Sequence, residues 1–230
     1  MGTVFNYLQG MDDMAVIIRL IFATVCGSLI GWERVVRRHS AGIRTFALVS
    51  LGSAVAAVLN LYLAGLDGMS ADVSRIPAGV VSGIGFLGAG TIIVTGRNQI
   101  KGLTTAASLW VASCMGMAFG VGYMSVGVSC FLLVMVANLI LMKLSQKVEE
   151  NSRYVSLYIE VEETVGVKKI KKKLSQLGYS ITSMNKTKDK TLSSSDAALM
   201  IEVDFGEKHS HTGLLEELNN LEYVNYVEEI

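Results

Sequence analysis

The sequence predicts a membrane-embedded bundle of five α-helices followed by a small α+β domain. Two observations predict this division. Five apolar segments of 19 or 20 residues each fill the chain up to residue 142. Charged side chains are scarce in the same part, since residues 1–150 contain only 17 of the 40 Asp, Glu, Lys and Arg residues. We therefore expect a membrane domain over residues 1–147 and a water-exposed domain over residues 148–230.

Each apolar segment is long enough to cross a bilayer. At a rise of about 1.5 Å per residue, about 20 helical residues match a hydrocarbon core of about 30 Å. The expected spans are residues 14–32, 46–64, 76–94, 103–121 and 123–142. Only Gly122 separates the last two spans, and a single helix of about 40 residues would overshoot the bilayer. A tight hairpin at Gly122 is therefore expected.

Basic residues concentrate in alternate loops, which predicts the orientation. The basic residues of the first and third loops are Arg34, Arg37, Arg38, Arg44, Arg97 and Lys101. The second loop instead contains Asp67 and Asp72 with a single Arg75. By the positive-inside rule, we expect the N-terminus outside and the first loop, the third loop and the C-terminal domain in the cytoplasm.

A glycine-rich run, GIGFLGAG at residues 83–90, lies inside the third apolar segment. It contains the G-x-G-x-x-G pattern of dinucleotide sites, but no acidic residue follows until Glu149, so the fingerprint is incomplete. Small residues at four-residue spacing instead indicate close helix packing in lipid. The expected packing residues are Gly79, Gly83, Gly85, Gly88, Gly90, Gly116 and Gly120. A broken helix that lines a transport site is the alternative.

Charged and polar residues gather at the predicted cytoplasmic edge of the membrane. The candidate functional residues there are Glu33, Arg34, Arg44, Thr45, Arg97, Lys101, Thr104 and Thr105. The group is either a topological anchor with an interfacial ion pair or a site for an anion or a partner. No Ser-His-Asp or Cys-His arrangement and no carboxylate pair accompanies it, so we expect no catalytic residue and no enzyme.

The C-terminal part shows strand and helix periods of an ordinary soluble domain. Strands are expected at residues 154–161, 179–186, 197–205 and 223–227, and helices at 166–176 and 212–221. The order β-α-β-β-α-β is that of the ferredoxin-like split unit.

Two polar groups stand out in this part. Five lysines between Lys168 and Lys173 form a charge run that is either a solvated helix face or attracted to anionic lipid. No aromatic residues interleave them, so no nucleic-acid partner is expected. His209 and His211 lie two residues apart. They are either exposed polar side chains or a pair of metal ligands.

Three stretches together resemble the MgtC/SapB family of bacterial membrane proteins. They are GWER at 31–34 with AGIRT at 41–45, SGIGFLGAG at 82–90, and GLTTAA at 102–107 followed by Trp110. The resemblance implies a bacterial inner-membrane protein with a role in magnesium homeostasis or growth at low Mg²⁺. It also implies a cytoplasmic regulatory domain of the ACT type after the membrane domain.

The segment from Glu163 to Gly166 resembles the start of such ACT-type domains. Glu163 and Gly166 are therefore candidates for binding a small-molecule ligand, and family analogy implies a homodimer.

The residues favour a regulator over a transporter. Mg²⁺ usually takes one or two carboxylates among its oxygen ligands, and only Glu33 lies beside a span on the inner side. We therefore expect a protein that binds and modulates other membrane proteins, with the lipid bilayer as its second partner. The alternative is a transporter of Mg²⁺ or another cation, in which an oligomer multiplies Glu33. Mg²⁺ is then the one cofactor to consider, and no metal ligand is assigned.

Overall fold

The computed structural model describes residues 7–37, 39–66, 72–95, 99–162, 166–187, 196–207 and 211–230. The chain divides into two compact units. The first, called the membrane domain below, contains residues up to 94 together with 100–140. The second consists of residues 95–99 and 141–230, and its part from residue 150 onward is called the tail.

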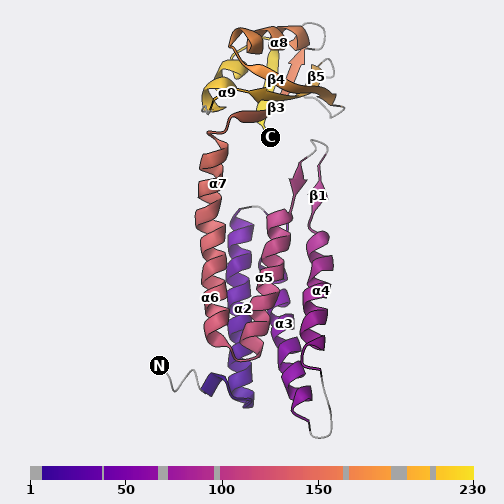
Figure 1. The fold of residues 1–230 in the computed structure, drawn as a ribbon, viewed down its shortest axis with the longest axis vertical. Coiled ribbons are helices and arrows are strands. Elements are labelled where there is room, and N and C mark those ends of the chain that lie inside the picture. The colour runs from indigo at the N-terminus through magenta and orange to yellow at the C-terminus, as the bar shows by residue number, and fades with distance from the viewer. Residues whose placement is uncertain are drawn as a thin grey trace. The chain divides into compact units, whose positions relative to one another are not determined.

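Apolar helices build the membrane domain, and they run side by side (Figure 1). The helices are α2 (Asp13–Val36), α3 (Ile43–Ala64), α4 (Arg75–Ala89), α5 (Leu103–Gly120) and α6 (Met124–Val136). Among the described residues, four helical segments are long and apolar enough to cross a membrane: Asp13–Val36, Ile43–Ala64, Leu103–Gly120 and Met124–Glu149. The prediction of a multi-pass membrane protein is confirmed for these four.

The third apolar segment differs from its prediction. Helix α4 has only 15 residues, or about 22 Å, and ends at Ala89 instead of continuing to Val94. Thr91 helps to end it, because its Oγ1 donates a hydrogen bond to the Gly88 carbonyl at 2.8 Å. The following residues are β-branched and form strand β1 (Ile93–Val94), which pairs with β2 (Ile100–Lys101).

The turn between α5 and α6 is as tight as expected. Gly122 has a φ of 82°, in the left-handed region that glycine adopts without strain. After Val136 the helix continues through a π-helical turn, η1 (Ala137–Leu141), into α7 (Met142–Glu149). The last helix therefore runs beyond residue 142, where the predicted span ends.

Glycines allow α2, α3 and α5 to approach one another closely. A Cβ on Gly27 would lie 2.6 Å from the Phe46 carbonyl oxygen. A Cβ on Gly116 would meet the backbone of Ser50, and one on Gly120 would meet the backbone of Ala54. A hydrogen bond between Ser53 Oγ and Ser113 Oγ, 2.8 Å long, joins α3 to α5 at the same interface. The centre of the domain is thus fixed by backbone contact between helices.

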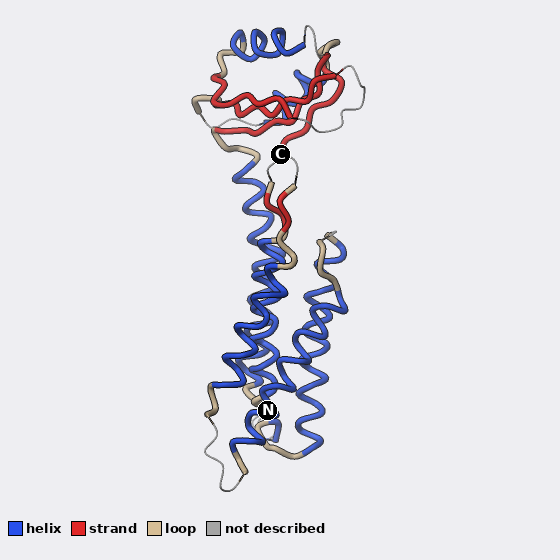
Figure 2. The backbone as a smooth tube through the Cα atoms, turned by 90° about the vertical axis from the view of Figure 1, so that its right-hand side faces the viewer, coloured by secondary structure: helices blue, strands red, loops and turns tan. Residues whose placement is uncertain are grey.

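The tail has the predicted order of elements. These are β3 (Tyr154–Glu162), α8 (Gly166–Gln176), β4 (Ser180–Thr187), β5 (Asp196–Asp204), α9 (His211–Asn219) and β6 (Val224–Glu229). The strands form an antiparallel sheet in the order β4-β5-β3-β6, the arrangement of a split β-α-β unit. Figure 2 shows α8 lying over one face of this sheet. Leu157, Ile159, Ile170, Leu174 and Leu218 are fully buried between sheet and helices.

Candidate functional site

A buried ion pair lies at the end of α2, and we call Glu33, Arg34 and Arg37 the Glu33 cluster. Glu33 Oε2 is 2.9 Å from Arg34 Nε, and Glu33 Oε1 is 2.5 Å from Arg37 Nε. Helical periodicity explains the second contact, because residues four apart lie on the same face. One carboxylate therefore bridges two guanidinium groups.

Burial makes this cluster chemically unusual. Glu33 is 8% exposed and Arg34 only 1%. Both Glu33 oxygens, together with Nε and Nη1 of Arg34, have no aligned hydrogen bond in the described part of the chain. The contacts are thus ion pairs within charge-contact distance, without the hydrogen bonds that usually offset the desolvation of buried charges. Because two guanidinium groups contact one carboxylate, the cluster has a net positive charge. The Nε and Nη1 donors of Arg34 remain without an aligned hydrogen bond.

His39 follows the cluster in the loop after α2. Its backbone N–H donates a hydrogen bond of 3.0 Å to the Arg34 carbonyl. Burial, and next the nearby Arg34 charge, lower the pKa of the His39 imidazole below its ordinary value. His39 is therefore neutral at pH 7 and adds no third positive charge to the cluster.

The other candidates from the edge that the sequence predicts to be cytoplasmic are not joined to this cluster. Arg44, Thr45, Lys101 and Thr104 are exposed, while Thr105 is buried in α5. Arg97 lies outside the described residues. Within the described chain, no hydrogen bond or ion pair connects the four exposed residues or Thr105 to Glu33 or Arg34.

Sequence analysis also missed Arg37 as a functional candidate. Its four-residue spacing from Glu33 was the available signal, and the structure makes it the second partner of the carboxylate.

The glycines of α4 have a different environment from those of α5. A Cβ on Gly79, Gly83 or Gly85 would meet no atom of the described chain within 4 Å. On Gly88 it would lie 3.4 Å from the Ala106 Cβ of α5, and on Gly90 it would be nearest to a carbonyl of its own helix. The expected packing face thus forms within this chain at Gly116 and Gly120 of α5, whereas three of the α4 glycines lie on open surface.

This open face of α4 continues into a groove. The groove has a volume of about 370 Å³ and lies between α3, α4 and α5. Its lining is Leu48, Val49, Gly52, Ser53, Val80, Gly83, Ile84, Leu87 and Ser113. Phe86, on the same short helix, is 83% exposed. We call the surface of Gly79 and Gly83, which lie four residues apart on one side of α4, together with this groove the α4 face.

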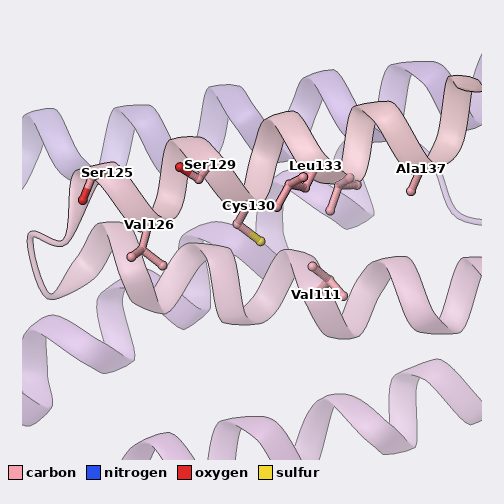
Figure 3. Close-up of a pocket in the computed structure, with 8 residues that line it drawn as sticks. Val111, Ser125, Val126, Ser129, Cys130, Leu133 and Ala137 are labelled. Carbon is pink, nitrogen blue, oxygen red and sulfur yellow. The ribbon is translucent and has the colours of Figure 1, made fainter.

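A second groove lies between α5 and α6 (Figure 3). It has a volume of about 510 Å³, and its lining includes Val111 from α5 with Val126, Cys130 and Leu133 from α6. None of its lining residues carries a charge at neutral pH. Such a surface suits lipid chains or another apolar helix and offers an ion no counter-charge.

A further buried cation was not among the candidates. Arg19 in α2 is fully buried, and its three guanidinium nitrogens have no hydrogen-bond partner in the described structure. Its Nη1 lies under the turn at Gly122, where a Cβ would come within 2.6 Å of it. This places a positive charge near the C-terminal end of α5, where it interacts favourably with the helix dipole.

The tail candidates have a structural explanation or lie outside the described residues. Glu163 is outside them. A Cβ on Gly166 would lie 2.6 Å from the Val161 Cβ, so glycine lets α8 begin close to β3. Ligand binding at Glu163 and Gly166 therefore stays a prediction.

His209 is also outside the described residues, whereas His211 is buried at 3% exposure, in contrast to the expected exposed surface. Its Nδ1 is 2.6 Å from Glu229 Oε1 and its Nε2 is 3.5 Å from Ser152 Oγ. Nε2 also lies 3.1 Å from the Ser152 carbonyl, which can only accept, so this nitrogen carries a proton and is not set to activate the hydroxyl as a base. No group of three or more His, Cys, Asp or Glu residues in the described chain could hold a metal ion.

Comparison with known proteins places these features in a family. The model of the MgtC family matches residues 20–147, more than half of the chain. A protein of Escherichia coli named "Putative magnesium transporter YhiD" is 45% identical over 116 residues, which are 49% of this chain and 54% of that protein. Protein MgtC of Salmonella typhimurium is 38% identical over 134 residues, which are 58% of this chain and 55% of that protein.

An uncharacterized protein of Synechocystis is 41% identical over 129 residues, covering 56% of this chain and 53% of its own. The chain thus spans about half the length of the curated relatives it matches. No solved structure matches.

Proposed function

Because this chain belongs to the MgtC family, we propose that it acts in magnesium homeostasis or in adaptation to low Mg²⁺ by binding and modulating other membrane proteins. The observation that carries the proposal is the state of Glu33, the carboxylate beside a span at the inner edge. Two arginines already neutralise it, at 2.9 and 2.5 Å. A residue in this state holds its own neighbours and is poorly suited to bind a passing cation.

The proposal includes a topology. The four span-capable helices cross the bacterial inner membrane, and the short helix α4 with the segment after it makes the fifth crossing. The N-terminus lies outside and the tail lies in the cytoplasm, as the loop charges favour. The tail is an ACT-like regulatory domain that responds to a small molecule and can pair with a second copy; its split β-α-β arrangement supports this assignment.

Ion chemistry argues against a cation path through one chain. Mg²⁺ demands six oxygen ligands and gives up its water reluctantly. The buried polar groups of the described membrane domain are Arg19, Glu33, Arg34, Ser50, Ser53, Asn60, Thr105, Ser108, Ser113 and Asn138. Glu33 is the one anion in this set, which also contains two cations, Arg19 and Arg34. The interior of this domain therefore repels a divalent cation.

Two surfaces favour a protein partner. The α4 face presents small residues that no helix of the described chain covers, and a transmembrane helix of another protein could approach it as closely as α3 approaches α5. The groove between α5 and α6, whose lining residues carry no charge at neutral pH, offers a second apolar surface for a helix of the partner. The bilayer covers the remaining apolar surface.

The alternative function is transport of Mg²⁺ or another cation. The printed name of the Escherichia coli relative supports it, and an oligomer would bring several copies of Glu33 together. The alternative requires that Glu33 exchange its arginine partners for the ion.

Proximity labelling in bacterial cells under Mg²⁺ limitation tests the proposal. A labelling enzyme is fused to the tail, and the wild type is compared with Gly83→Leu, which fills the α4 face where nothing lies within 4 Å. Leu132→Ala, at an exposed position of α6, is the matched control. We expect a small set of membrane proteins to be labelled by the wild type and the control and to be lost in Gly83→Leu at equal expression. Labelling of abundant membrane proteins alone, unchanged in Gly83→Leu, contradicts the proposal.

A further inference from the structure

Helix α8 of the tail has one buried side and one basic side. Ile170 and Leu174 are fully buried and belong to the core between sheet and helices. Lys168, Lys171 and Lys172 are three and four residues apart, so they share the opposite side of the helix, and all three are exposed. No other described element of the tail lies over this side (Figure 2). We call these three residues the lysine face.

The two other lysines of α8 have partners within the tail. Lys173 Nζ is 2.6 Å from Glu217 Oε1 of α9, and Lys169 Nζ lies 5.2 Å from the centroid of the Tyr223 ring. In the described part of the chain, no ion pair or hydrogen bond engages an ammonium group of the lysine face. Its three charges are therefore free to meet an anion from outside the chain.

The positive charge of the tail is concentrated in its helices. Residues 150–230 contain fourteen Asp and Glu residues against ten Lys and Arg residues, so the tail as a whole is acidic. Helices α8 and α9 together contain five Lys and two Glu, one of which is the Glu217 that pairs with Lys173. An anionic surface therefore attracts the helix layer and repels the remainder of the tail.

Arg153, a further cation of the tail, is already neutralised. Its Nε and Nη2 donate to the two Asp204 oxygens at 2.6 and 2.7 Å. These hydrogen bonds, with one from the Gly206 N–H, lower the pKa of Asp204 to about 2, so the pair is fully charged at neutral pH. Arg153 thus has its counter-charge within the tail, in contrast to the lysine face.

The composition of α8 favours a lipid surface over a protein partner. Protein interfaces are enriched in aromatic residues and Arg and depleted of Lys. A hydrated ammonium group on a flexible stem instead suits the diffuse negative charge of phospholipid headgroups. The exposed residues of α8 are all polar, so contact would stop at the headgroups without insertion: Lys168, Lys169, Lys171, Lys172, Ser175 and Gln176.

The chain itself keeps a bilayer near the tail. Helix α7, which joins the tail to the last apolar helix, has 8 residues and is about 12 Å long. Such a tether gives a high effective concentration of lipid, so the attraction of about fivefold that each lysine adds at an anionic leaflet is sufficient for docking.

We propose that the lysine face docks the tail on anionic phospholipid headgroups. The docking is electrostatic and reversible, and salt weakens it. It requires a bilayer beside the tail and depends neither on the magnesium role nor on a protein partner, so the two proposals can fail separately.

The first test measures how fast an amine-reactive reagent modifies each lysine of the full-length wild type, with peptide mass spectrometry as the readout. Nanodiscs of phosphatidylcholine alone are compared with nanodiscs that contain phosphatidylglycerol in equal part. Lys186, exposed in β4, is the internal reference. We expect the lysine face to react at least about fivefold more slowly in the anionic nanodiscs and to recover in about 1 M salt, while Lys186 is unchanged. Equal rates in the two nanodiscs, or equal slowing of Lys186, would overturn the proposal.

Two soluble probes distinguish the source of the anion. Glycerol phosphate added to the neutral nanodiscs provides the same phosphate group in solution and should not slow the reaction. Slowing equal to that in anionic nanodiscs would replace docking by a site for a soluble phosphate. Protection by polyglutamate without protection by anionic nanodiscs would assign the face to an acidic protein and overturn the proposal.

The second test removes one lysine at a time in the anionic nanodiscs. In Lys172→Gln the remaining Lys168 and Lys171 should react about fivefold faster than in the wild type. Lys186→Gln is the matched control, because it removes the same charge from the sheet, and it should leave both rates unchanged. Equal rates in the two variants would contradict docking through the lysine face.

Discussion

The membrane domain and the tail both bury ionisable side chains, but they treat them differently. In the tail, each ring nitrogen of His211 has an acceptor within 3.1 Å, so the residue connects three parts of one folded unit. In the membrane domain, Glu33 and Arg34 are held as an ion pair whose atoms lack aligned hydrogen bonds among the described residues. Because unmet buried donors are costly, this difference marks Glu33 with Arg34, and likewise Arg19, as side chains whose burial costs the membrane domain stability.

The two regions also differ in what holds their cores together. The tail packs branched aliphatic side chains between a sheet and two helices, as in any small soluble domain. The membrane domain gains no hydrophobic drive between helices in lipid, and its contacts are backbone against backbone at glycines. Substitutions of opposite kinds should therefore be the harmful ones in the two regions.

The largest effect is expected from truncating the tail core. Leu174→Ala removes a fully buried side chain of α8 and should destabilise the tail by about 2–5 kcal/mol through the cavity it leaves. Chemical denaturation of the full-length protein, followed by the proteolytic sensitivity of each region, measures this. The membrane helices should stay protected. Equal loss of protection in both regions would show that the two units do not fold separately.

Removal of one arginine from the Glu33 cluster should come next. Arg34→Gln leaves a buried carboxylate with one partner fewer, which should cost about 3 kcal/mol in the membrane domain. Arg44→Gln, at an exposed position in the first turn of α3, is the matched control and should change stability by about 0.5 kcal/mol or less. Thermal unfolding in detergent compares them, and equal stability of the two variants would mean that the cluster is solvated rather than buried.

Adding a methyl group distinguishes the two sets of glycines. In Gly116→Ala the new Cβ meets the Ser50 backbone, which cannot move aside, so a loss of about 1–3 kcal/mol is expected. Gly83→Ala meets nothing within 4 Å and should be neutral or slightly stabilising, because alanine favours the helix. Unfolding in detergent tests this pair. A destabilising Gly83→Ala would show that α4 packs more closely than the single chain indicates.

The smallest effect concerns the Arg153–Asp204 pair. The lowered pKa of Asp204, about 2, means that the pair contributes stability above the ordinary range of an aspartate and loses it as the pH falls toward 2. Wild type and Asp204→Asn should therefore differ slightly and by a constant amount from pH 5 to pH 8, and should converge only as the pH falls to about 2 or below. A difference that changes between pH 5 and 8 would show that Asp204 is not ionised throughout this range.

Sequence patterns predict the elements of this protein better than they predict its contacts. Apolar length located four of the membrane helices, and periodicity gave every element of the tail in order. The end of α4 was missed because residues 91–94 are as apolar as a span, although they are β-branched and form a strand. Hydropathy does not distinguish an apolar helix from an apolar strand, whereas the backbone preference of β-branched residues does.

The candidate site was also predictable only in part, because a sequence pattern shows which residue types are present but not which of them lie close together in space. A lone acidic residue among arginines at a membrane edge is visible in the sequence, and Glu33 and Arg34 are indeed paired. Four-residue spacing of glycines indicated close packing, but spacing cannot tell which helix has a neighbour, as Gly83 and Gly116 show. The environment of His211 depends on strands and a connecting segment distant in sequence, so exposure was the wrong expectation.

Reconstitution tests most directly whether Glu33 holds its arginines or carries an ion. The wild type and Glu33→Gln are placed in liposomes that contain a Mg²⁺ indicator, an inward Mg²⁺ gradient is applied, and the entry rates are compared with those of protein-free liposomes. With Glu33 committed to Arg34 and Arg37, we expect all three rates to be equal. Mg²⁺ entry above the protein-free rate in the wild type, abolished by Glu33→Gln, would contradict the account and establish the transporter instead.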